Sequence, residues 1–178
     1  ELLSADDPLI RLAAMSLLSE IKPADRALQN VFRQALQDPK LEMRLLATAG
    51  LIENGKDVKQ GRQRFLAALT GKSKSERKAA ARIVAALGAD AAFAVPALIE
   101  MAKESVFDRV AEKALIAIGS AATPQILTVF QGDDYSAKRI ATVVCEDMDT
   151  IDPRLVPFLI EMLKDKRWAN HNAARALA

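Results

Sequence analysis

The most reactive side chains in the sequence belong to its single histidine, His171, and its single cysteine, Cys145. They could form a nucleophilic pair only if the fold brought them together. Carboxylates also cluster between Glu146 and Asp152, where paired acids could hold a metal ion or transfer a proton. The sequence has no Cys-x-x-Cys, no His-x-x-x-His and no glycine-rich loop ahead of a helix. We therefore expect no catalytic residues, no metal and no cofactor, and we interpret the carboxylates as a solvated turn.

Basic residues are concentrated in one segment of the chain. Residues 56–82 carry a local charge of +7, whereas the net charge of all 178 residues is +2. The small total excludes a chain that binds nucleic acid through its overall charge. Whether the basic segment forms a binding surface depends on the elements that position it.

A repeat of about 32 residues organises the whole sequence. Its reference positions are Arg11, Arg44, Arg77, Asp108, Lys138 and Asn170. Three residues after each reference position comes an alanine: Ala14, Ala47, Ala80, Ala111, Ala141 and Ala173. This spacing places the alanines on the inner face of a helix, where small side chains let two helices approach closely. Cys145 occupies another inner position, which predicts a small core residue.

Each alanine-bearing helix is preceded by another predicted helix, at about 25–37, 58–70, 91–103, 122–131 and 152–165. Pro96, Pro124 and Pro157 suit the first turns of three of these helices. Glycines end three of the second helices, at Gly55, Gly88 and Gly119. The sequence therefore predicts an all-α single domain over 1–178. Its helical hairpins are expected at about 1–22, 23–55, 56–88, 89–119, 120–149 and 150–178.

The segment Asp38–Ala47, DPKLEMRLLA, resembles the turn and second helix of a HEAT repeat, particularly the short bacterial kind. The segment 91–119 is similar, and the resemblance extends over essentially the whole chain. It implies an armadillo-type, right-handed α-solenoid of about six hairpins. Such folds serve mainly as scaffolds, so the resemblance is specific for fold and not for function.

The resemblance also implies a ladder of ion pairs between turn aspartates and second-helix basic residues. The spacing matches for Asp38 with Arg44, and Asp133 or Asp134 with Lys138 is a further candidate pair. Asp6 or Asp7 with Arg11 nearly matches, whereas Asp108 and Asn170 depart from the pattern.

Three enzyme classes share this kind of repeat. Deoxyhypusine hydroxylases hold iron on His-Glu pairs, which one histidine followed by Asn172 cannot provide. The related alkylpurine DNA glycosylases use an aromatic basic groove, to which only Tyr135 and Trp168 could contribute. Nothing in the sequence points to the chromophore of the bilin lyases. We expect a non-enzymatic protein.

In a solenoid of this kind, the second helices line the concave surface. The strip opposite the alanines is predicted to be open, and none of its positions in the last four repeats is acidic. Its candidate binding residues are Lys74, Lys78, Arg82, Arg109, Lys113, Arg139, Arg167, His171 and Arg175. An apolar end of the groove is predicted at Leu12, Leu41 and Leu45.

These features predict a binding scaffold whose concave surface accepts an acidic, partly apolar protein or peptide. The alternative is a nucleic acid or other polyanion, whose phosphates the basic strip would follow. Scarce aromatic residues, 4% of the chain, favour the protein partner, because stacking on bases needs aromatic rings.

The ends of the sequence lack the polar capping repeats that a solenoid needs. Glu1–Ser4 resembles the last turn of a helix, and the chain stops at Leu177-Ala178 before any closing glycine. We therefore expect a fragment of a longer protein, whose end faces pack on adjoining repeats or on another copy. Apolar runs fall short of the roughly 18 residues that a membrane span needs. We expect no membrane partner, and the cytoplasm is favoured.

Overall fold

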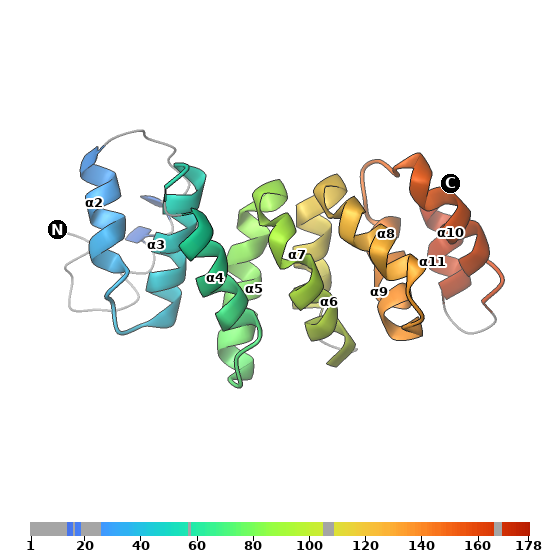
Figure 1. Ribbon diagram of the computed structural model, residues 1–178, viewed down its shortest axis with the longest axis horizontal. Coiled ribbons are helices and arrows are strands. Elements are labelled where there is room, and N and C mark those ends of the chain that lie inside the picture. The colour runs from blue at the N-terminus through green and yellow to red at the C-terminus, as the bar shows by residue number, and fades with distance from the viewer. Residues whose placement is uncertain (1–13, 16, 19–25, 57, 105–108, 166–168) are drawn as a thin grey trace. The chain divides into compact units, whose positions relative to one another are not determined.

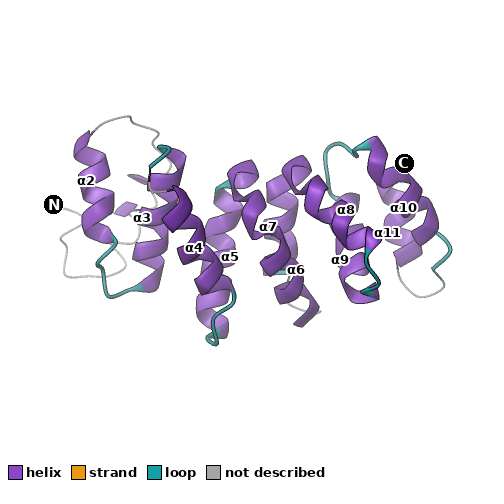
Figure 2. Ribbon diagram, in the orientation of Figure 1, coloured by secondary structure: helices purple, strands orange, loops and turns teal. Residues whose placement is uncertain are grey.

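The computed structural model describes residues 14–15, 17–18, 26–56, 58–104, 109–165 and 169–178 (Figures 1 and 2). Over these ranges the chain forms helices and short turns and no β-strand, which confirms the all-α prediction. The chain divides into two compact units, Glu1–Val84 and Ala85–Ala178, here called unit 1 and unit 2.

The named helices of unit 1 are α2 (Arg26–Ala35), α3 (Leu41–Glu53), α4 (Val58–Leu69) and α5 (Lys74–Ala86), which runs across the boundary. The α-helices of unit 2 are α6 (Val95–Glu104), α7 (Val110–Ile118), α8 (Thr123–Gln131), α9 (Tyr135–Glu146), α10 (Val156–Met162) and α11 (Ala169–Ala176). Three 3₁₀ segments precede α6, α8 and α10: η2 (Gly88–Ala94), η3 (Gly119–Ala122) and η4 (Pro153–Leu155). Residues at the predicted starts of α6 and α10 lie within or just before these more tightly wound 3₁₀ segments. The two α-helices therefore begin a few residues later than predicted.

The core of unit 1 is built where α2 packs on α3. Phe32 of α2 is fully buried among Met15, Met43 and Leu51. The ring of Phe32 lies so close to α3 that a Cβ atom on Gly50 would overlap it. Only glycine therefore permits this close approach of the two helices.

The core of unit 2 is built from pairs of antiparallel helices. Contacts join α6 to α7, α8 to α9 and α10 to α11, and the second helices α7, α9 and α11 also touch in succession. Between the hairpins, the rings of Phe130 and Phe158 stack with centroids 5.6 Å apart. On the outside of α10, Ile160 and Leu163 are exposed, whereas Leu177 is half-buried.

The repeated alanines are buried wherever the structure describes them. Ala47 and Ala80 in unit 1 and Ala111, Ala141 and Ala173 in unit 2 are all at most 1% exposed, and Ala14 is also buried. The prediction of an inward-facing alanine in each second helix is thus confirmed. Gly55, Gly88 and Gly119 have φ angles of 66°, 52° and 62°, the left-handed conformation expected just after a helix.

Among the described residues, one helical stretch, Val110–Gln131, is by length and composition apolar enough to cross a membrane. It is not a straight helix, because the chain turns at Gly119 and divides it into α7 and α8. Leu115, Ile118 and Ile126 from this stretch are buried in the core of unit 2.

Candidate binding surface and cavities

The predicted basic strip lies on the second helices, and its residues differ in exposure. In unit 1, Lys74 and Arg82 of α5 are exposed, and Lys78 is half-buried. In unit 2, Arg139 of α9 is half-buried. The exposed members of unit 2 are Arg109, Lys113, His171 and Arg175. Arg167 lies outside the described residues.

Two arginines of the strip in unit 2 are held by carboxylates. Arg109 donates from Nε to Oε2 of Glu112 at 2.9 Å, and its Nη2 lies 3.9 Å from Asp147 Oδ2. The hydrogen bond to Glu112 and its charge raise the pKa of the Arg109 guanidinium. Arg175 Nη1 lies 2.9 Å from Glu146 Oε1. These pairs lower the positive charge that the strip offers to a ligand.

Two of the carboxylates that pair with the strip, Glu112 and Glu146, are themselves largely buried. The side chains of Glu112 and Glu146 are only 9% and 10% exposed, and Asn172 of α11 also donates to Glu146. Buried carboxylates require such partners, because desolvation of an unpaired charge is costly. Glu112 and Glu146 occupy helical positions outside the strip. The residue types within the strip therefore do not reveal that these carboxylates pair with it.

The basic residues of the α4–α5 hairpin in unit 1 are placed differently. Five of them have exposed side chains and form no ion pair with residues that the structure describes: Lys59, Arg64, Lys72, Lys74 and Arg82. Glu76 is the acidic residue of this hairpin in the described part of the chain. Unit 1 therefore keeps an accessible positive surface.

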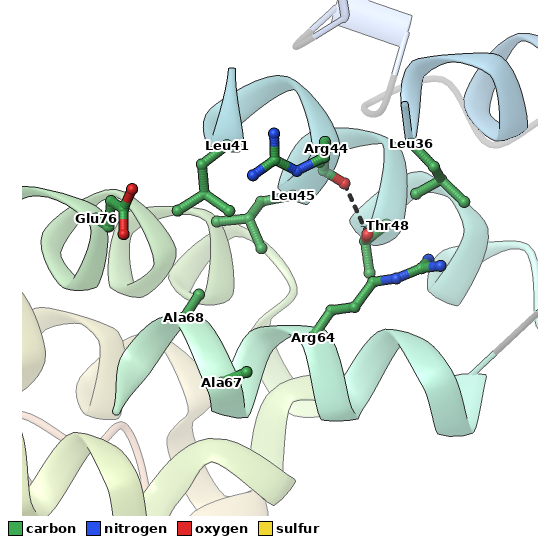
Figure 3. A pocket seen from close by; sticks show the side chains of 9 residues that line it. All are labelled: Leu36, Leu41, Arg44, Leu45, Thr48, Arg64, Ala67, Ala68 and Glu76. Atoms are coloured by element: carbon green, nitrogen blue, oxygen red, sulfur yellow. Dashed lines mark hydrogen bonds between the residues drawn. The ribbon is translucent and has the colours of Figure 1, made fainter. Parts of the chain in front are cut away.

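Beside this hairpin, unit 1 contains a cavity of about 340 Å³, here called the arginine cavity. Its walls come from the end of α2, from α3, from α4 and from the start of α5. The lining residues are Leu36, Leu41, Arg44, Leu45, Thr48, Arg64, Ala67, Ala68 and, from α5, Glu76. Figure 3 shows Leu41 and Leu45 pointing from α3 toward Ala67 and Ala68, while Arg64 extends from α4 beside Thr48.

Main-chain hydrogen bonds fix one of the two arginines in this cavity. Arg44 Nη1 donates to the carbonyl oxygens of Asp38 at 2.7 Å and of Pro39 at 2.8 Å. The Thr48 hydroxyl donates to the Arg44 carbonyl oxygen at 2.7 Å. The Arg44 side chain is thus held at the start of α3, and its other N–H groups are available as donors.

The predicted apolar end of the groove needs correction. Leu45 is only 1% exposed, and Ala49 at the next position of the strip is 4% exposed. The strip is therefore closed at these positions, because α4 packs against this side of α3. Leu41, which is half-buried, and Leu45 form the apolar wall of the arginine cavity instead. Leu12 lies outside the described residues.

The expected ladder of aspartates and basic residues takes a different form. Arg44 binds main-chain oxygens at its turn and not the carboxylate of Asp38, whose Oδ1 accepts from the Lys40 N–H. Asp134 pairs with Lys103 of α6 and caps α9, so it is not a partner of Lys138. Asn170 accepts from the His171 N–H. Asp6, Asp7, Arg11 and Asp108 lie outside the described residues.

The reactive side chains are engaged in structural roles. Cys145 is fully buried, and burial raises the pKa of its thiol to about 12, so the thiolate is not formed at neutral pH. Asp152 accepts from the guanidinium and N–H of Arg154, and these bonds lower its pKa to about 2. Among the described residues, no group of three or more His, Cys, Asp or Glu is arranged to hold a metal ion.

Comparison with known proteins adds no assignment: no protein-family model matches the chain, and no curated protein matches it either.

Proposed function

We propose that the chain is a HEAT-like, right-handed α-solenoid that serves as a non-enzymatic scaffold for a partner protein. The repeated hairpins, the buried alanine in each second helix and the left-handed glycines that follow three of these helices support this class of fold. Each feature recurs with the period of the sequence, as expected when identical units stack on one another.

The arginine cavity is the single observation that carries the proposed function. It combines an apolar wall, Leu41 and Leu45, with the guanidinium groups of Arg44 and Arg64, whose two charges exceed the single carboxylate charge of Glu76. A segment with an aspartate or glutamate next to a leucine matches both parts. The carboxylate would accept hydrogen bonds from the arginines, and the leucine would cover the apolar wall.

The basic α4–α5 hairpin adds attraction over a longer range. The exposed side chains of Lys59, Lys72, Lys74 and Arg82 would draw an acidic segment toward the cavity and increase the rate of association. A protein partner suits this surface better than a nucleic acid, because the cavity is walled by aliphatic side chains. Bound bases would need aromatic rings on which to stack.

The test is fluorescence anisotropy of the chain with a labelled acidic–leucine peptide, single-stranded DNA and duplex DNA at several salt concentrations. Arg64→Ala should weaken peptide binding about tenfold, the value of a hydrogen bond to a charged group. Lys59→Ala is the matched control, since Lys59 is an exposed base on α4 that does not line the cavity. It should change the affinity less than threefold.

The apolar contribution is tested by Leu41→Ser, with Leu66→Ser as the control on α4. Both leucines are half-buried, and only Leu41 lines the cavity. We expect Leu41→Ser alone to weaken binding markedly. Tighter binding of DNA than of the peptide, with affinity falling by about one power of salt per phosphate, would instead support a nucleic-acid partner. Absence of binding by any probe at low salt would overturn the proposal.

A further inference from the structure

Unit 2 contains a second cavity, of about 370 Å³, between the first helices α6 and α8 and the turn that leads into α9. Its walls are apolar and its rim is acidic. Pro96 and Ile99 of α6 face Val129 of α8, and the rim carries Glu100, Asp133 and Asp134. We call it the acidic cavity. It shares no residue with the arginine cavity.

The charge at this rim is only partly balanced. Lys103 Nζ lies 2.9 Å from Glu100 Oε2 and also pairs with Asp134. Asp134 is further occupied, because its Oδ1 accepts from the Ala137 N–H at 3.0 Å. Asp133 is exposed and has no ion-pair partner among the described residues. One lysine against three carboxylates leaves a negative rim beside an apolar cavity.

A polar group in the wall of the cavity has an unmet hydrogen bond. The side-chain oxygen of Gln125 on α8 is buried and accepts no hydrogen bond from the residues that the structure describes. A buried acceptor without a donor is unfavourable. Rotation about the terminal torsion of a glutamine is nearly free, so the oxygen can turn toward a donor that enters the cavity.

We infer that the acidic cavity binds an arginine, flanked by an aliphatic residue, from a segment of a partner protein. The guanidinium presents five N–H donors in a planar fork, which can serve the Asp133 carboxylate and the Gln125 oxygen together. The methylene groups of the arginine and its aliphatic neighbour would cover Pro96, Ile99 and Val129. A volume of about 370 Å³ suits such a pair of side chains.

The inference is tested with the full chain and a labelled peptide that has a central Leu-Arg-Leu flanked by glycine and serine. Three further peptides replace the arginine by lysine, citrulline or glutamate. Citrulline keeps the shape of arginine and removes its charge. We expect the arginine peptide to bind best, the citrulline peptide to bind at least tenfold more weakly and the glutamate peptide not to bind. Equal affinities for the arginine and citrulline peptides would overturn the inference.

Variants then locate the binding. Asp133→Asn should weaken the arginine peptide about tenfold, and Gln125→Leu should weaken it several-fold without loss of thermal stability. Asp149→Asn is the matched control, because Asp149 is also an exposed acid of unit 2 but does not line the cavity. It should alter affinity less than twofold.

The methyl resonances of Ile99 and Val129 should shift on addition of the arginine peptide. Equal losses in Asp133→Asn and Asp149→Asn, or unshifted methyl signals, would show that the peptide binds elsewhere. Because these peptides and variants concern unit 2, their failure would leave the proposed role of the arginine cavity untouched.

Discussion

The second helices of the two units carry basic residues at the same offsets, yet these residues meet different neighbours. On α5 of unit 1, Lys74 and Arg82 project from a hairpin whose nearby sequence is poor in acids. In unit 2, Arg109 at the N-cap of α7 and Arg175 of α11 bind the largely buried Glu112 and Glu146. Lys74 and Arg82 therefore offer charge to a ligand, whereas Arg109 and Arg175 serve the fold.

The difference shows that helical position alone does not define a binding surface. A cation becomes available to a partner only when no carboxylate on the same or a neighbouring helix reaches it. In unit 2, Glu112 lies about one helical turn after Arg109, whereas Glu146 of α9 reaches Arg175 from the neighbouring second helix. The contrast extends to the cavities, since arginines line the one in unit 1 and carboxylates edge the one in unit 2.

The largest effect on stability is expected at the buried alanines, which the second helices of both units share. Ala80→Leu in unit 1 and Ala111→Leu in unit 2 should each lower the free energy of unfolding by about 1–3 kcal/mol, because overpacking forces helices apart. Thermal melts measure both effects, with Ala117→Leu at an exposed position of α7 as the control. An unchanged melting temperature for Ala80→Leu or Ala111→Leu would mean that this alanine does not face a tight helix interface.

A smaller effect on stability should differ between the two units when a charge is removed. Glu146→Gln removes the charge that holds Arg175 and should destabilise the protein by about 1 kcal/mol, near the upper end for partly exposed pairs. Lys74→Gln in unit 1 should change stability by less than about 0.5 kcal/mol, since it breaks no ion pair with a described residue. Urea unfolding of both variants gives the comparison. Equal losses would contradict the division between structural and available charges.

Much of the fold was predictable because local rules and packing agree. The alanine spacing predicted the buried faces of α5, α7 and α9, and glycine predicted the turn at Gly119. The candidate site was less predictable. Arg64 belongs to a first helix, so its place in the wall of the same cavity as Arg44 depends on how α4 packs on α3. The pairing of Glu112 and Glu146 with the strip could not be predicted, because burial and pairing are properties of the folded chain.

The smallest expected effect is a loss of stability at low pH. The hydrogen bonds from Arg154 lower the pKa of Asp152 from 3.8 to about 2. A group with a lowered pKa in the folded state contributes stability above its ordinary pKa and loses it as the pH falls through the folded value. Unit 2 should therefore lose this contribution between about pH 4 and pH 2.

Urea unfolding midpoints measured from pH 6 to pH 2 test this dependence. Asp152→Asn should flatten the lower part of the curve, whereas Asp149→Asn should not. A curve for Asp152→Asn that superimposes on that of the unchanged protein would refute the assigned role of the Arg154 pair.

The most direct test of the contrast between the units is a pair of charge reversals measured with one ligand. Arg64→Glu reverses the charge of an exposed arginine in unit 1, and Arg109→Glu does the same in unit 2. Fluorescence anisotropy with the acidic–leucine peptide measures the affinity of each variant. We expect at least a tenfold loss for Arg64→Glu and less than a threefold loss for Arg109→Glu. A larger loss for Arg109→Glu, or equal losses for both, would contradict the division between available charges in unit 1 and structural charges in unit 2.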